Sequence, residues 1–204
     1  MSQDSLLIPK FFESNDYFID ENVNYFKFGN TYKVYNEATE QVGTIKQIVP
    51  GWHKFLRVLF NKSKGMFPFL LEVRDIDDDL QVTIRRGWTF WMSKITITDA
   101  NEQEIGTITQ KFKFFKPTFI ITNAQGNVIA KITGDWKAWD FKIEDNNETP
   151  IGTINKKWGG VVKEFFTRAD KYRVAIVPEY AEDTNKIAIV SCAITIDMVL
   201  KNNK

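Results

Sequence analysis

The sequence contains very little of the chemistry on which most enzymes and metalloproteins depend. It has one cysteine, Cys192, so no disulfide can form within the chain and the cysteine-rich zinc patterns are excluded. It has one histidine, His53, which argues against a histidine-based metal site and against catalytic designs that need two imidazoles. The Gly-x-Ser-x-Gly nucleophile elbow, the phosphate-binding loop and the His-Glu-x-x-His motif are also absent. We therefore expect a protein that is not an enzyme and that holds no cofactor.

The sequence also lacks an excess of charge and a long hydrophobic run. Lys and Arg number 27 against 26 Asp and Glu, and the net charge of +1 indicates no nucleic-acid partner. The most apolar segment, residues 187–200, contains Asp197 and is shorter than the roughly 20 residues that a helix needs to cross a bilayer. Residues 1–4 show no basic stretch followed by an apolar run, so we expect no secretory signal. Together with the single cysteine, these features favour a cytoplasmic location.

What the sequence has in abundance is aromatic and β-forming residues, arranged as repeated hairpins. Aromatic residues make up 14% of the chain. Runs rich in Ile, Val, Thr and aromatic residues alternate with polar residues, and clusters of Asn, Asp and Gly separate them. This pattern predicts β-hairpins. The full copies of the pattern span residues 32–45, 95–108, 119–132 and 141–154, and a shorter relative spans 71–84.

One spacing recurs in all four full copies, where nine positions separate an early β-forming residue from a small residue. The pairs are Val34 and Gly43, Ile97 and Gly106, Ile121 and Ala130, and Ile143 and Gly152. A small residue inside a strand usually marks a bulge, a bend or the close approach of another backbone. Reuse of one unit predicts a curved sheet, and closing that sheet into a barrel removes its exposed edges.

The C-terminal segment, residues 186–200, is the most apolar part of the chain, with apolar residues on all sides. Periodicity alone does not distinguish a buried helix from a buried strand here. A helix that is hydrophobic on every face must be enclosed. We therefore expect a mainly β fold, in which a closed antiparallel barrel surrounds this segment as a central hydrophobic C-terminal helix.

The C-terminal third also carries a recognisable set of motifs. They are Ile151–Ile154, Lys157–Trp158, Phe165–Thr167, Ala169–Asp170, Tyr172, Pro178, Lys186 and Ile196–Asp197. With the hairpins upstream, this set resembles the phospholipid scramblase family, whose relatives include the LURP-one-related and Tubby-like proteins. The resemblance implies a Tubby-like barrel of about twelve strands around the C-terminal helix. It also implies a single domain over residues 6–200, with the core helix at 186–200 and short tails at 1–5 and 201–204.

The sequence departs from the family pattern at the proposed calcium loop. Arg168 replaces the first acid of that loop and Lys171 replaces its Asn, which leaves Asp170 as the one metal-ligand candidate. Because Ca²⁺ binds six to eight oxygen ligands, two cations at these positions argue against a calcium site. The Pro-rich arm and the acylated cysteine cluster of longer family members are missing as well, so we expect no lipid anchor on this chain.

The segment Gly51–Lys64 is the best candidate for contact with a membrane. It has basic residues, no acidic residue and bulky apolar residues between them. In a membrane interpretation, the apolar side chains lie at the headgroup boundary and the cations lie near anionic lipid. In the alternative interpretation, the segment is a long connection that packs on the barrel wall. The candidate lipid-contact residues are Trp52, Lys54, Phe55, Arg57, Lys62 and Lys64.

Other groups of residues have simpler interpretations. Residues 111–117 mix lysine with phenylalanine, which suits phosphate or single-stranded nucleic acid, but we favour a strand with lysines outward. Asp75 and residues 77–79 lack the EF-hand spacing, and we expect a solvated hairpin tip. Cys192 has apolar neighbours, so we expect a buried thiol. We expect Asp197 at the mouth of the barrel, paired or hydrated.

The resemblance implies two forms of function. The first is a scramblase-like protein at the inner face of the plasma membrane, which moves phospholipids between leaflets without ATP or associates with the membrane there. The alternative is a Tubby-like binding module for anionic lipid headgroups or for a protein partner, with no transport activity. In both forms the expected partner is a phospholipid surface, while the sequence identifies no protein partner.

Overall fold

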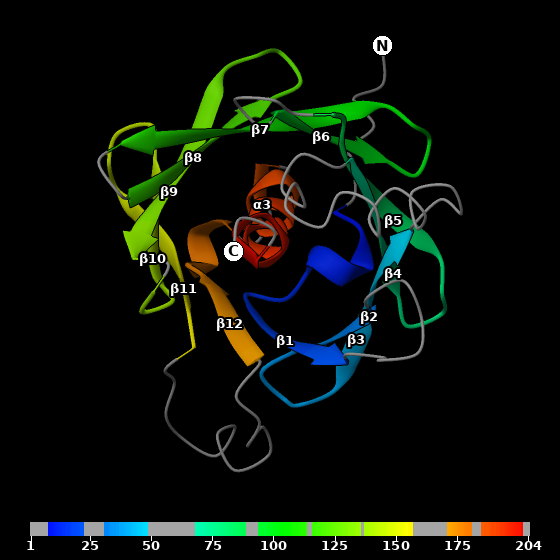
Figure 1. Cartoon of the computed structure of the whole chain (residues 1–204). Helices are drawn as coiled ribbons and strands as arrows, with labels where there is room; N and C mark the ends of the chain where they lie inside the picture. The colour runs from blue at the N-terminus through cyan, green and yellow to red at the C-terminus, as the bar shows by residue number, and fades with distance from the viewer. Residues whose placement is uncertain are drawn as a thin grey trace, which may run out of the picture.

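The computed structural model describes residues 8–22, 31–48, 68–88, 94–113, 116–135, 137–156, 171–180 and 185–201. Within these ranges, strands close into an antiparallel barrel in which each strand pairs with its sequence neighbours and β1 pairs with β12 (Figure 1). The strands are β1 (Asp16–Asn22), β2 (Thr31–Tyr35), β3 (Gln41–Ile48), β4 (Phe69–Asp75), β5 (Leu80–Arg86), β6 (Lys94–Asp99), β7 (Glu104–Lys113), β8 (Lys116–Asn123), β9 (Val128–Asp135), β10 (Asp140–Asp145), β11 (Pro150–Asn155) and β12 (Lys171–Ile176). The expected closed barrel of twelve strands is confirmed.

The nine-position spacing in the sequence is the register of the hairpins. Val34 lies opposite Gly43, and Ile97 lies opposite Gly106. Directly after each of these pairs the register shifts at a β-bulge. The same arrangement occurs in the other two full copies and in the shorter relative. A bulge bends its strand and increases the twist, so its repetition around the sheet favours closure.

Five short turns close these hairpins, and they share one geometry. In the turn at residues 99–103, Asp99 Oδ1 accepts hydrogen bonds of 2.8 Å from the backbone N–H groups of Asn101 and Gln103. The fourth residue of this turn, Glu102, has a φ of 64°. The same side-chain role belongs to Asn36, Asp75, Asn123 and Asp145. The Asn and Asp clusters of the sequence are therefore the residues that form the turns.

The small residues lie where a neighbouring strand leaves no room for a side chain. A Cβ atom added to Gly106 would lie 2.2 Å from the carbonyl oxygen of Thr122. One added to Gly43 would lie 2.1 Å from the carbonyl oxygen of Arg74. The prediction that these positions mark the close approach of another backbone is confirmed.

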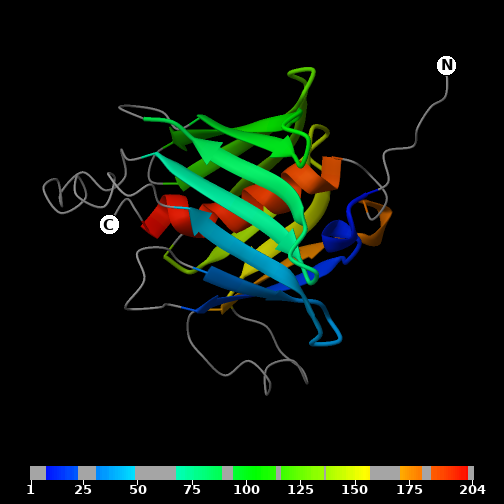
Figure 2. The same cartoon turned by 90° about the vertical axis from the view of Figure 1, so that its right-hand side faces the viewer.

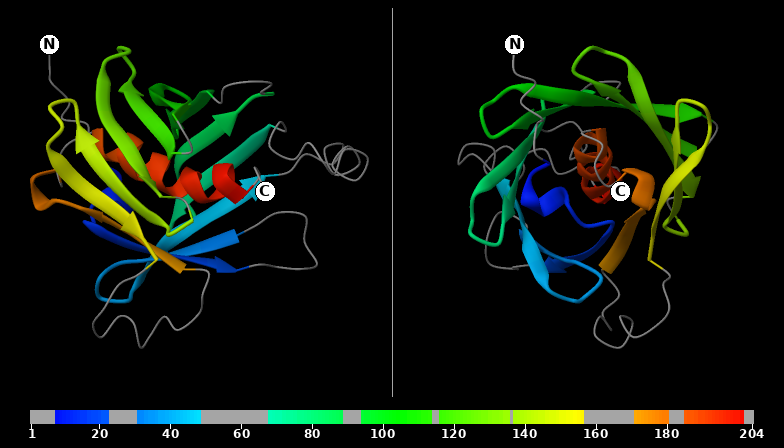
Figure 3. Two further views of the ribbon diagram at one scale, coloured as in Figure 1. Left: turned by 60° about the vertical axis from the view of Figure 1, so that its left-hand side comes forward. Right: turned by 180° about the vertical axis from the view of Figure 1, so that it is seen from behind.

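The helix α3 (Asn185–Lys201) runs along the inside of the barrel, as Figure 2 shows. Every residue from Lys186 to Ile196 is buried, so no face of this part of the helix meets solvent. The two views of Figure 3 show strands around the helix from further directions. The expected central hydrophobic helix is confirmed, and Cys192 on it is fully buried. Burial raises the pKa of the Cys192 thiol.

The barrel has two different ends. We call one the turn end, because it carries the five short turns and the start of α3 (Figure 2). We call the other the far end, where each odd-numbered strand is joined to the next strand and where α3 finishes. This division follows from the up-and-down order of the strands, since consecutive hairpin connections alternate between the two ends.

The N-terminal segment covers the turn end from the inside. Its 3₁₀ turn η1 (Lys10–Phe12) places Phe11 and Phe12 in the core, both fully buried. The Phe11 ring stacks on that of Tyr17, with centroids 5.9 Å apart. A second 3₁₀ turn, η3 (Pro178–Tyr180), follows β12 before α3 begins.

A buried lysine ties this N-terminal segment to the central helix. Lys186, in the first turn of α3, donates hydrogen bonds to Asn15 Oδ1 at 3.0 Å and to the carbonyl oxygen of Glu13 at 3.3 Å. Burial lowers the pKa of Lys186 to about 8, and the nearby carboxylates of Glu37 and Glu13 oppose that shift. The ammonium group is therefore held in the interior by hydrogen bonds at a cost in desolvation.

We predict that Gly106→Ala destabilises the protein by about 1–3 kcal/mol, as overpacking of a tight site does. The new methyl group would press on the carbonyl oxygen of Thr122, a backbone atom that cannot rotate away. Gly87→Ala is the matched control, because a Cβ there meets nothing within 4 Å. Urea denaturation of both variants measures the difference. Equal midpoints would show that the close strand approach is absent.

We also predict a pH dependence of stability that comes from Lys186. The free energy of unfolding of the wild type, relative to that of a Lys186→Met variant, should increase as the pH rises from about 8 towards about 10.4, the ordinary lysine pKa. The folded protein releases the Lys186 proton near pH 8, whereas the unfolded chain keeps it to higher pH. Stability rises with pH wherever the unfolded state holds more protons. Urea denaturation of both proteins at several pH values measures this. A constant difference would contradict the buried position of the ammonium group.

Candidate functional site

The turn end is acidic over its described residues. Four of the five short turns contain Asp or Glu, and none of the five contains Lys or Arg. Within the turn 75–79, Asp75 accepts backbone hydrogen bonds, and Asp78 forms an ion pair with Lys46 that lowers the pKa of the Asp78 carboxyl. The prediction that these acids form an exposed hairpin tip is confirmed. The described residues contain no group of His, Cys, Asp and Glu side chains arranged to hold a metal ion.

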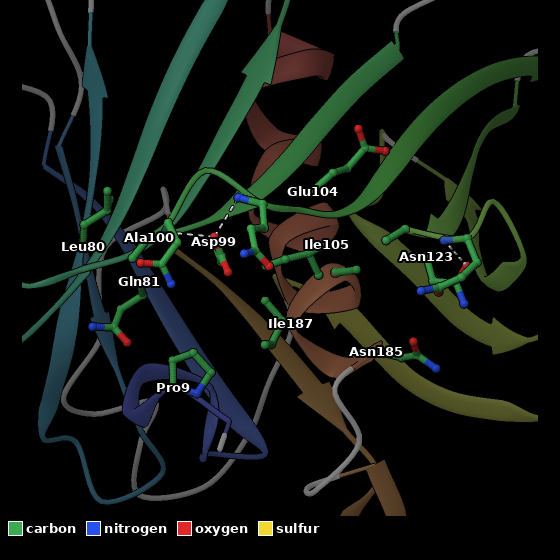
Figure 4. A pocket seen from close by; sticks show the side chains of 15 residues that line it. Pro9, Leu80, Gln81, Asp99, Ala100, Glu104, Ile105, Asn123, Asn185 and Ile187 are labelled. Atoms are coloured by element: carbon green, nitrogen blue, oxygen red, sulfur yellow. Dashed lines mark hydrogen bonds between the residues drawn. The ribbon is translucent and has the colours of Figure 1, made fainter. Parts of the chain in front are cut away.

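A pocket of about 630 Å³ opens at the turn end, between the N-terminal segment and the start of α3 (Figure 4). Ile105 and Ile187 point towards each other at its floor. Its polar lining consists of carboxylates and carboxamides, and no Lys or Arg contributes to it. The polar lining residues are Gln81, Asp99, Asn101, Gln103, Glu104, Asn123, Gln125 and Asn185. Such a lining does not suit a phosphate group, which binds to cations and clustered N–H donors.

The tryptophans are unevenly distributed along the sequence. All six tryptophans of the sequence lie between strands that are joined at the far end, and none lies in a short turn. They are Trp52 between β3 and β4, Trp88 and Trp91 between β5 and β6, Trp136 and Trp139 between β9 and β10, and Trp158 between β11 and β12. Tryptophan has an apolar ring and a polar N–H group, and it is enriched where proteins meet the headgroup region of membranes.

Exposed cations lie beside the described tryptophans. Trp88 is 50% exposed, and Arg85 and Lys94, on the strands that it connects, are exposed as well. A further arginine in this region, Arg86, points inward and is buried, with its guanidinium 4.7 Å from the ring centre of Phe69. The described part of the far end therefore combines exposed positive charge with an exposed aromatic ring.

A chain of contacts links the far end to the central helix. The ammonium of Lys156 lies 4.5 Å from the ring centre of Trp139, and the Trp139 ring lies 5.5 Å from that of Tyr172. The Tyr172 hydroxyl donates a hydrogen bond of 3.2 Å to the carbonyl oxygen of Ile194 in α3. This contact holds the surface around Trp139 in a fixed position relative to the helix.

The sequence-based site residues fall outside the described part of the chain. Trp52, Lys54, Phe55, Arg57, Lys62 and Lys64 are outside the described residues, and so are Asp170 and His53. The strand ends on either side of the lipid-contact candidates, Ile48 and Phe69, lie at the far end. The side chain of Asp197 is outside the described part as well. The predicted roles of these residues stay predictions.

The lysine and phenylalanine stretch at residues 111–117 differs from the strand that we expected. It spans the end of β7 and the start of β8, with Phe112 opposite Pro117 and Lys113 opposite Lys116. The stretch is thus the junction of a hairpin, which the alternating pattern alone did not reveal. Lys111 is exposed, in agreement with an outward lysine.

Two features of this site were missed from the sequence. The contact of Trp139 with Tyr172 joins residues that are distant along the chain, and no local pattern announces it. The position of Trp88 and Trp139 at one end did have a signal, because every tryptophan of the sequence falls outside the short turns of the repeated hairpins. That signal acquires its meaning only once the strands are known to alternate in direction.

Comparison with known proteins gives relatives over much of the chain. A human protein described as phospholipid scramblase family member 5 is 34% identical over 102 residues, which are 47% of this chain and 37% of that protein. A phospholipid scramblase family protein of Schizosaccharomyces pombe is 20% identical over 184 residues, which are 84% of this chain and 46% of that protein. The matches thus span less than half the length of either relative.

A solved structure and a family model complete the comparison. The X-ray structure of a protein from Arabidopsis thaliana matches with a TM-score of 0.55 and 8% identity, covering 98% of this chain and 99% of the other. At that identity the likeness concerns the fold alone, and the fold is Tubby-like as expected. Among the described residues, no helix is both long and apolar enough to cross a bilayer. The Scramblase family model matches residues 1–201, and the chain belongs to the Scramblase family.

Proposed function

We propose that this protein binds phospholipids as a peripheral, scramblase-like protein at the cytoplasmic face of the plasma membrane. Membership of the Scramblase family supports a lipid-related function in general. The observation that carries the specific proposal is the position of the segment Gly51–Lys64. In the sequence it joins β3 to β4, whose connected ends lie at the far end, and the described Trp88 and Trp139 also lie at that end.

The chemistry of this segment suits an anionic bilayer surface. Trp52 and Phe55 supply apolar surface for the headgroup boundary, and the segment has no acidic residue to repel anionic lipid. Each Lys or Arg near such a surface contributes about 1 kcal/mol of binding free energy. The proposed cationic contacts are Lys54, Arg57, Lys62 and Lys64.

The packed interior of the barrel bears on whether a lipid headgroup can enter it. Residues 186–196 of α3 and the inward side chains of the strands, such as Ile97 and Ile132, are buried against one another. The described interior is mostly apolar, although Arg86 and Gln110 are buried in it, and burying a charged headgroup among apolar side chains is costly. This favours binding at the membrane surface as the first function. ATP-independent movement of lipid between leaflets is the second candidate, and family membership favours it.

Binding should also be independent of metal ions. The proposal assigns no catalytic residue and no cofactor, because cation–lipid attraction and aromatic insertion need neither. Arg168 and Lys171 replace calcium ligands of the family pattern, with Asp170 left as the one acid. We therefore propose that lipid binding proceeds without calcium.

We predict that replacing Lys54, Arg57, Lys62 and Lys64 by Ser weakens binding to phosphatidylserine-containing vesicles by about 4 kcal/mol at low salt, about 1 kcal/mol per cation. Co-sedimentation with vesicles measures this, with a calcium chelator present throughout. The matched control exchanges Lys for Arg and Arg for Lys at the same four positions and should bind as the wild type does. Undiminished binding by the Ser variant would show that the segment does not contact lipid.

The two candidate functions are separated by a lipid-movement assay. Dithionite is an ion that does not cross the bilayer, so it reduces only the fluorescent lipids in the outer leaflet of proteoliposomes. When lipids stay in their leaflet, the fluorescence therefore falls to a plateau at about half of its initial value. If the remaining fluorescence is lost with the wild-type protein but retained with the Ser variant, lipid movement between leaflets is established. Vesicle binding with the plateau retained at every protein density would leave surface binding as the function.

A further inference from the structure

The described residues of the far end form a ring of positive charge around much of the barrel. Arg85 and Lys94 flank the β5–β6 connection, and Lys111 lies near the end of β7. Lys137 lies between β9 and β10, and Lys156 follows β11. The acids Asp20, Asp135 and Asp140 also lie towards this end, so the cations exceed the acids among these residues.

The short turns at the opposite end are acidic, although Lys10 and Lys46 also lie at that end and Lys46 is paired with Asp78. The short turns contain no cation, and their carboxylates include Glu37, Asp77, Glu102 and Glu148, all of which are exposed. The barrel is therefore electrically polar along the direction of α3, with its negative end at the start of the helix. A negatively charged surface attracts one end of such a molecule and repels the other, which fixes its orientation on approach.

Apolar surface is exposed at the same end as the cations. Trp88 is 50% exposed and Ile48 is 37% exposed, and both lie at strand ends of the far end. Trp139 lies between the rings of Phe141 and Tyr172 with Lys156 beside it. Cations together with a half-exposed tryptophan are complementary to the headgroup region of an anionic bilayer. There the tryptophan ring lies among the headgroups, and the cations bind phosphate and carboxylate groups.

We propose that these residues, which we call the far-end rim, dock the barrel upright on anionic phospholipid. The rim consists of Arg85, Trp88, Lys94, Lys111, Lys137 and Lys156. In this orientation the axis of the barrel stands along the membrane normal, α3 ends towards the lipid, and the acidic turns face water. The inference rests on the proposed membrane association, and it adds a contact surface distinct from the segment 51–64.

The charge of the rim is tested with two triple variants. Arg85, Lys94 and Lys111 are exposed, and their replacement by Ser should weaken affinity for phosphatidylserine-containing vesicles roughly 100-fold at low salt. Lys10 lies at the turn end, while Lys131 and Lys142 lie in the middle of β9 and β10. All three are outside the rim, and their replacement by Ser is the charge-matched control. The control should bind within a few-fold of the wild type. Equal weakening by both variants would show that only net charge matters and would overturn the proposal.

The orientation is tested with fluorescent labels at the two ends. Cys192 is buried, so a label attaches at the introduced thiol in Gly87→Cys, next to the rim, or in Ala124→Cys, in the exposed β8–β9 turn. With an environment-sensitive dye and brominated lipids, the label at position 87 should shift to the blue and be quenched on vesicles. The label at position 124 should stay unchanged.

The outcomes separate this inference from the proposed function. Absence of binding by the unlabelled wild-type protein to any vesicle would remove the proposed function and the inference together. Binding with quenching at position 124, or with no quenching at position 87, would leave membrane association in place and overturn the upright docking. Loss of binding to single-stranded RNA by the rim variant, with vesicle binding unchanged, would assign the rim to nucleic acid instead.

Discussion

The structure depends on one constraint, the burial of a helix that is apolar on every side. Residues 186–196 of α3 expose no face to solvent, and the barrel supplies the apolar surface that encloses them. In turn, the barrel needs the helix, since twelve strands enclose more space than their own inward side chains fill. Sheet and helix therefore stabilise each other, and Phe11 and Phe12 of η1 complete the core between them at the turn end.

Closure of the sheet has a second consequence, which concerns function. Because the strands run up and down, the short turns gather at one end and the remaining connections at the other. The short turns hold acidic and amide residues and no Lys or Arg, whereas every tryptophan of the sequence falls in the other set of connections. A chain with a net charge of only +1 thus becomes a molecule with two chemically different ends. Average composition conceals this difference, and only the topology reveals it.

Much of the fold could be predicted from the sequence because its determinants are local. The pairing of Ile97 with Gly106 and the turn at Asp99 are both encoded within a dozen residues. The entry of Phe11 into the core and the hydrogen bonds of Lys186 to the N-terminal segment join distant parts of the chain, and no local pattern predicts them. The predicted lipid-contact residues lie outside the described residues and stay predictions, while the described residues of the far end come from separate connections that only the topology brings to one end.

The central claim is that α3 remains the core of the barrel while the far end meets lipid. Cys192, fully buried on α3, reports on this directly through its rate of alkylation by a membrane-permeant maleimide. The account predicts that the thiol of the folded protein stays unreactive both in solution and on phosphatidylserine-containing vesicles, and that it reacts only on unfolding. Rapid alkylation on vesicles, with the protein still folded in solution, would show that the helix leaves the barrel for the bilayer and would contradict the account.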